Sequence, residues 1–82
     1  MSVPTFEQRR AKILTLADLE HQTTLARTYV KKLRTKAKQQ SSLAAKLEVN
    51  EDIKLAEKVV RELRLKSFDI EDELIARAAS EG

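Results

Sequence analysis

Apolar side chains recur along this chain at helical spacing, in two long runs. In the first run they alternate in steps of four and three residues, at positions 26, 30, 33, 37, 40, 44 and 47. Steps of this kind form the heptad seam of a helix that packs against a second helix. Alanine at three of these positions and Gln40 at a fourth keep the seam narrow, so that a neighbouring helix can approach closely.

The first run has a recognisable start. Thr5 is followed three residues later by Gln8, which is the spacing of a capping box, and Pro4 just ahead of it costs no helical hydrogen bond. A broader apolar stripe follows and leaves the heptad frame between residues 16 and 19: Phe6, Ile13, Leu16 and Leu19. We therefore predict a first helix over about residues 5–48, after a flexible N-terminus at residues 1–4.

The second run is more regular and predicts a second helix over about residues 51–80. Its positions step by three and four residues throughout: Ile53, Ala56, Val60, Leu63, Ser67, Ile70 and Leu74.

The two runs do not share one register. Extending the first frame past Leu47 places Glu51 in the seam, whereas the apolar Val49 and Ile53 lie two residues away from that frame. A chain reversal removes this discontinuity. Asn50 is a favourable N-cap residue, and acidic side chains in the turn after it favour the positive end of the helix dipole. We therefore predict an all-α fold, a coiled-coil-like antiparallel helical hairpin that reverses near Asn50.

Two other arrangements fit the same pattern. One continuous helix over residues 5–80 would be about 110 Å long at about 1.5 Å per residue. Alternatively, Ser41 or Ser42 can cap a short third segment over residues 42–48. In every case we expect residues 5–82 to form a single domain, because 82 residues suffice for one domain and no more.

The composition agrees with a helical protein that associates with other chains. The sole Gly is at position 82 and the sole Pro at position 4, and 35% of the residues are charged. Only 4% are aromatic, so a monomer of this length would bury a thin core, and we expect self-association or a partner subunit. The chain has no Cys, no secretory signal at its start and no apolar run of about 18 residues, which leads us to expect a soluble intracellular protein.

The second helix carries a further apolar row on a different side. It comprises Leu65, Phe68, Ile75 and Ala79 and is interrupted by Asp72. One neighbouring helix covers one row, so the second row predicts a protein interface, in a homodimer or a larger assembly. Alternatively, the N-terminal stripe covers both rows within the chain. The residues expected at the interface are Ile53, Val60, Leu63, Leu65, Phe68, Ile70, Leu74 and Ile75.

Basic residues suggest a second function. No Asp or Glu occurs between His21 and Leu47, and the same span holds seven Lys and Arg residues. Such a face can neutralise the phosphates of nucleic acid, or it can be a solvated face that is partly paired with the acidic residues 69–73. An anionic membrane is a poorer match because no bulky aromatic face lies opposite the charges. The candidate nucleic-acid-binding residues are Arg27, Lys31, Lys32, Arg34, Lys36, Lys38, Arg61 and Arg64.

Catalytic chemistry has little support in the sequence. His21 is the sole histidine, and the consecutive carboxylates of residues 71–73 point in different directions around a helix, so they cannot converge on a metal. We therefore expect no catalytic residue, metal, cofactor or small-molecule substrate. The sequence predicts a non-enzymatic interaction module that self-associates or docks into a larger assembly, with nucleic-acid binding as the alternative.

Overall fold

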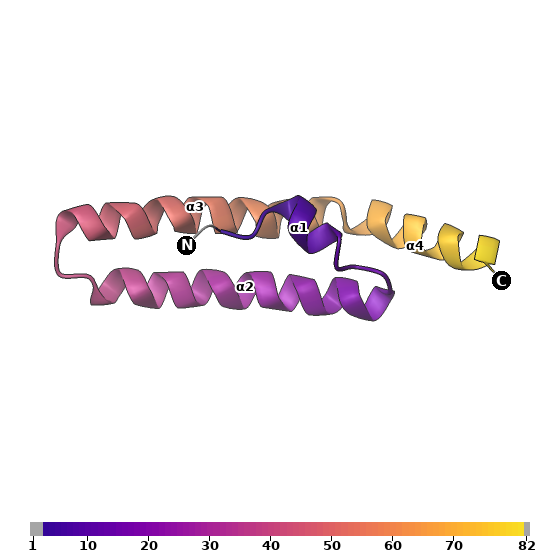
Figure 1. The fold of residues 1–82 in the computed structure, drawn as a ribbon, viewed down its shortest axis with the longest axis horizontal. Coiled ribbons are helices and arrows are strands. Elements are labelled where there is room, and N and C mark those ends of the chain that lie inside the picture. Colours follow the sequence, from indigo (N-terminus) through magenta and orange to yellow (C-terminus); the bar gives the residue numbers. More distant parts are fainter. Residues whose placement is uncertain (1–2, 82) are drawn as a thin grey trace.

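A computed structural model describes residues 3–81 of the chain, and these residues form an all-helical structure. The helices are α1 (Phe6–Arg10), α2 (Leu16–Gln39), α3 (Leu43–Leu65) and α4 (Ser67–Glu81). Helices α2 and α3 lie side by side and antiparallel, α1 lies on one face of this pair, and α4 continues from the end of α3 (Figure 1). The longest dimension is 56 Å. This is about half the length of the continuous rod, so the rod is excluded.

The chain reverses at residues 40–42, and the prediction of a reversal at Asn50 was wrong. Helix α2 ends at Gln39, and Gln40 has extended backbone angles of φ −76° and ψ 133°. Ser42 is the N-cap of α3, and its hydroxyl accepts a hydrogen bond of 3.1 Å from the backbone N–H of Ala45. Asn50 lies exposed inside α3. Ser42 was therefore correctly considered as a cap, but the helix it begins runs to residue 65 and not to 48.

The shift in register that suggested a turn is real, but it arises earlier in the chain. The inward-facing row of α3 extends back from Ile53 to Val49, one helical turn away, and Val49 is buried. Ala44 and Leu47, which the first heptad frame included, belong to α3 and are exposed. Because those two positions were assigned to the first helix, the predicted reversal lay about two turns too late.

The first run contains a break that the prediction of one helix over 5–48 missed. The capping box of Thr5 and Gln8 is confirmed, but α1 ends at Arg10. A second capping box begins α2, where Thr15 accepts a hydrogen bond of 3.1 Å from the N–H of Asp18 and the Asp18 carboxylate accepts one from the N–H of Thr15. A Thr followed three residues later by an acid is itself a sequence signal for a helix start, and it lies where the apolar stripe changes phase.

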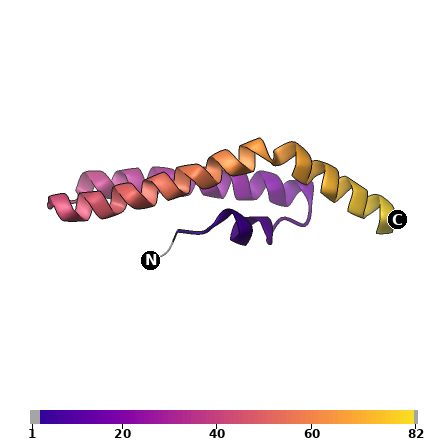
Figure 2. The ribbon, with the colours of Figure 1, turned by 90° about the horizontal axis from the view of Figure 1, so that it is seen from above.

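The second run forms two helices, α3 and α4, with a bend at Lys66. The prediction of a single helix over 51–80 was therefore wrong. Lys66 has φ −98° and ψ 4°, and α4 leaves this position at an angle to α3 (Figure 2). Helical hydrogen bonds still span the bend, from the N–H of Lys66 to Glu62 and from the N–H of Ile70 to Lys66, each 2.9 Å long. The Ser67 hydroxyl donates to the carbonyl of Arg64, and back-bonding of this kind bends helices.

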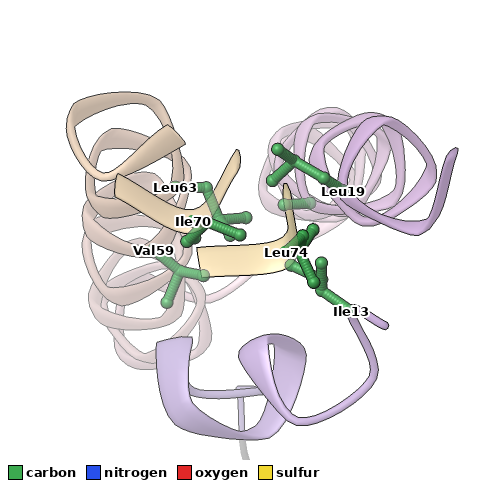
Figure 3. Close-up of a cluster of buried hydrophobic side chains, with 7 residues drawn as sticks. Ile13, Leu19, Val59, Leu63, Ile70 and Leu74 are labelled. Carbon is green, nitrogen blue, oxygen red and sulfur yellow. The ribbon is translucent and has the colours of Figure 1, made fainter. Parts of the chain in front are cut away.

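The bend brings α4 over the larger of two hydrophobic clusters. Ile13 and Leu63 are fully buried at its centre, and the side chains of α2, α3, α4 and the segment after α1 meet there (Figure 3). The buried members are Ile13, Leu19, Ala26, Val59, Leu63, Ile70 and Leu74. The smaller cluster lies closer to the turn and comprises Val30, Leu33, Val49 and Ala56. The predicted seam of the first run is therefore confirmed at positions 26, 30 and 33.

Polar contacts hold α1 against the hairpin. Arg9 is buried and donates a hydrogen bond of 3.1 Å to the side-chain oxygen of Gln22, which is also buried. Burial lowers the pKa of the Arg9 guanidinium from its ordinary value, and the charge interaction with Tyr29 opposes this shift. Arg10 pairs with Glu73 of α4 at 2.7 Å. The short helix is thus attached to both α2 and α4.

The predicted flexible N-terminus falls partly outside the described residues, which exclude residues 1 and 2. Val3 and Pro4 are partly buried, and Val3 packs against the smaller cluster. Gly82, at the end of the predicted domain, also lies outside the described residues.

The position of the chain reversal can be tested with two matched alanine substitutions. Ser42→Ala should lower the free energy of unfolding by about 0.5–2 kcal/mol, because the first turn of α3 loses its hydrogen-bond acceptor. Asn50→Ala should raise it by a few tenths of a kcal/mol, because Ala is the better helix former at an exposed interior position. Urea denaturation followed by circular dichroism measures both. A larger loss for Asn50→Ala would contradict the reversal at residues 40–42.

Candidate functional site

The eight predicted interface residues separate into two groups by burial. Leu63, Ile70 and Leu74 are buried in the larger cluster, and Ile53 and Val60 are partly buried against the clusters. These five side chains pack against other parts of the same chain. Leu63, Ile70 and Leu74 therefore hold the fold together and are closed to a partner, contrary to the sequence-based expectation, whereas Ile53 and Val60 remain partly accessible.

The other three predicted residues are open to solvent. Leu65, Phe68 and Ile75 are 72%, 76% and 57% exposed, and we call these three side chains the outer row. At 3.6 residues per turn, Phe68 and Ile75 lie within roughly 20° of each other around α4, and about 100–160° from Ile70 and Leu74. Helix α4 therefore has two apolar faces, and the chain covers only one of them.

The N-terminal stripe leaves the outer row uncovered. Ile13 and Leu19 are buried in the cluster that also contains Ile70 and Leu74, and Phe6 packs against the same cluster. The alternative in which this stripe covers both rows is therefore wrong. Beyond this cluster, α4 projects past the end of the hairpin (Figure 1), and residues 75–80 are all exposed.

Basic side chains lie at the start of the outer row, and acidic side chains lie along its middle. Arg61, Arg64 and Lys66 lie at the end of α3 and just after it, and all three are exposed. The acidic run lies in α4, where Asp69, Asp72 and Glu73 are exposed. The segment over residues 61–81 is therefore basic at its start, acidic in its middle and apolar along one side.

The eight predicted nucleic-acid-binding residues are also divided by the structure. Five of them line one groove between α2 and α3, which has a volume of about 440 Å³ and which we call the basic groove. Its lining consists of Arg27, Val30, Lys31, Arg34, Glu57, Val60, Arg61 and Arg64. Lys32 and Lys36 line a shallower surface of α2, which also includes Lys31 of the groove. Lys38 is exposed outside both.

The register of the hairpin decides which charges meet. With the reversal at residues 40–42, Arg34 lies opposite Glu57, at a distance of 3.3 Å between Nη2 and Oε1. The acidic run was expected opposite Arg27, Lys31 and Lys32, but it lies farther along the hairpin, where Glu73 pairs with Arg10. The groove therefore keeps five basic side chains and a single carboxylate along its lining.

The basic groove is open because α1 lies elsewhere. The N-terminal arm and α1 form a crevice with Leu55, Lys58, Val59 and Glu62 of α3. By helical spacing, Lys58 and Glu62 lie roughly 100° or more around α3 from Glu57 and Arg64. The arm thus covers one side of the hairpin and leaves the groove side accessible.

Other kinds of site were sought in the same residues. Within the described part of the chain, no group of three or more His, Cys, Asp and Glu side chains is placed to hold a metal ion. His21 is exposed. No helix among the described residues combines the length and the apolar character needed to cross a bilayer.

Comparisons with protein-family models, with curated proteins and with solved structures found no match. The candidate surfaces of this chain are therefore the outer row and the basic groove, each argued from its own geometry.

The separation between buried side chains of the larger cluster and exposed side chains of the outer row can be tested with two leucines of α3. Leu63→Ala should destabilise the protein by about 2–5 kcal/mol, because it leaves a cavity in the larger cluster. Leu65→Ala removes the same atoms from a side chain that is 72% exposed, and its effect should stay within about 0.5 kcal/mol. Urea denaturation at a low protein concentration measures both variants. Equal losses would contradict the assignment of the two rows.

Proposed function

We propose that this protein is a non-enzymatic protein–protein interaction module that self-associates through the outer row. The observation that carries the proposal is the exposure of Leu65, Phe68 and Ile75, which are 57–76% open to solvent on one side of the segment over α3 and α4. Rows of large apolar side chains on a small protein mark interaction surfaces more often than isolated exposed residues do. The proposed occupant of the row is a second copy of the same chain.

Burial of the outer row supplies the driving force. Each large apolar side chain that moves from water into an interface contributes about 1.5–3 kcal/mol. Two copies bury six such side chains, and the free energy gained opposes a cost of association of about 4–15 kcal/mol. A concentration-dependent dimer is the expected result, in which neither copy needs to rearrange its internal core.

The spacing of the outer row fits an antiparallel arrangement of the two copies. A twofold axis at the level of Ile70 places Leu65 of one copy beside Ile75 of the other, because each lies five residues from Ile70. The same axis sets Arg61, Arg64 and Lys66 opposite residues 79, 76 and 74 of the other copy, so the basic ends of the two copies lie apart. A parallel pairing would set every charged residue opposite its own counterpart, the basic ends included, which is unfavourable.

The projecting end of α4 fits the same arrangement. Residues 75–80 are exposed and extend beyond the hairpin (Figure 1), so they can reach a second molecule without a clash with α1 or α2. The inner face of α4 stays in contact with the larger cluster, since Ile70 and Leu74 are buried there. Self-association therefore adds a second layer to α4 on the side that the chain leaves open.

Self-association can be measured by multi-angle light scattering over a series of protein concentrations that includes tens of micromolar. The wild type should change from monomer to dimer across the series. Phe68→Gln and Ile75→Gln should shift this change to concentrations at least tenfold higher, because each removes at least about 1.4 kcal/mol of interface burial per dimer. Circular dichroism should show that both variants keep the helical content of the wild type.

A matched control is available in α3. Leu47 is 57% exposed, as is Ile75, but it lies near the turn and outside the outer row. Leu47→Gln should leave the dimer unchanged. A wild type that remains a folded monomer at every concentration would refute self-association, as would equal weakening by the Leu47 and Ile75 substitutions.

A further inference from the structure

We propose that the basic groove binds the phosphate backbone of double-stranded nucleic acid and does so without reading base sequence. The groove lies between α2 and α3, and the α2 side chains that line it are away from the outer row. The inference therefore does not depend on self-association.

The charge of the lining is the first argument. Arg27, Lys31 and Arg34 come from α2, and Arg61 and Arg64 come from α3. Glu57 is the single acid in the lining, which leaves an excess of four positive charges. The ion pair of Glu57 with Arg34 has side chains that are 42% and 59% exposed, and exposed pairs contribute only about 0–1 kcal/mol. A phosphate can therefore compete for Arg34 at little cost.

The spacing of the cations is the second argument. Arg27, Lys31 and Arg34 follow one another at steps of four and three residues, so they form a single stripe about 10 Å long on one wall of the groove. A strand of duplex DNA carries one phosphate per about 3.4 Å of helix axis, so the stripe spans about three phosphates. Arg61 and Arg64 stand one turn apart on the facing wall, and the phosphate backbone can be contacted from both sides.

The type of cation also fits phosphate. Four of the five basic side chains are arginines. The planar guanidinium group donates two parallel hydrogen bonds to phosphate oxygens, which a lysine cannot do.

The floor of the groove indicates how nucleic acid is contacted. Val30 is buried and Val60 is partly buried, and no aromatic side chain lines the groove. Proteins that hold single strands stack bases on aromatic side chains, and Tyr29 is not available for this because it packs against the smaller cluster. The groove therefore favours the backbone of a duplex over the exposed bases of a single strand.

An anionic membrane fits the groove less well than a duplex does. Interfacial helices place a broad apolar face beside their cations so that this face can enter the bilayer. Here the apolar residues between the cations are the two valines of the floor, which lie beneath the charged rim. The groove presents charge without an apolar face for lipid.

Binding can be tested by fluorescence anisotropy with the full chain and a labelled DNA duplex of about 20 base pairs. For each phosphate that the protein contacts, the logarithm of the binding constant for duplex DNA falls by about 0.9 for every tenfold rise in salt concentration. Four contacts predict a loss of about a hundredfold between about 50 and 200 mM salt. Duplexes of unrelated sequence should bind equally well, because the groove contacts only phosphates.

Two matched double substitutions on α2 locate the contact. Arg27→Gln with Arg34→Gln removes two charges from the groove, whereas Lys32→Gln with Lys36→Gln removes two charges from the shallower surface. The groove pair should reduce the salt slope by about two and weaken binding at low salt by tenfold or more. The second pair should leave the slope unchanged. Equal effects of the two pairs would overturn the proposal, because they would show a response to net charge alone.

The other anionic partners are tested under the same salt conditions. Vesicles that contain phosphatidylserine represent a membrane, and polyglutamate represents an acidic protein. The duplex should bind more tightly than either. Tighter binding of the vesicles or of polyglutamate, or no duplex binding at low salt, would overturn the proposal.

Discussion

The backbone N–H of Ala45 donates a hydrogen bond to the Ser42 hydroxyl at the start of α3. The position of this helix start is linked to which residues of α2 and α3 lie opposite each other in the hairpin. A reversal at residues 40–42 sets Val49 inside the structure and Arg34 opposite Glu57. A reversal eight residues later would turn other side chains inward and would bring the acidic run of α4 opposite the basic residues of α2. Because α2 and α3 are regular helices, the position of the reversal sets the partners of every residue along them.

The small residues of the seam have a consequence for the rest of the chain. Ala26 and Ala56 allow α2 and α3 to approach closely, but they bury little apolar area. In the larger cluster, α4 and the segment after α1 supply further buried apolar area through Ile13, Ile70 and Leu74. The bend at Lys66 is what allows α4 to contribute, and it also leaves the opposite face of α4 uncovered. The internal core and the outer row thus arise from the same bend.

The two proposed surfaces adjoin at the end of α3, where Arg61 and Arg64 of the basic groove lie next to Leu65 of the outer row. The outer row belongs to the end of α3 and to α4, whereas three of the five cations of the basic groove belong to α2. A dimer formed through the outer row would carry two basic grooves. Two linked sites bind one long duplex more tightly than either site alone when the geometry allows both to engage. Self-association and nucleic-acid binding would then reinforce each other.

The sequence by itself determined that the chain is helical, where the first cap lies, that positions 26, 30 and 33 face a partner helix, and that the second run has a further apolar row. These features are local, because they depend on hydrogen bonds within one turn and on the spacing of apolar side chains. Only the tertiary structure decided where the chain reverses, since Ser42 and Asn50 are both good caps and differ by less than about 1 kcal/mol in that role. Packing summed over the whole hairpin exceeds this difference. For the same reason, only the tertiary structure decided which cations share a groove and which apolar row remains open.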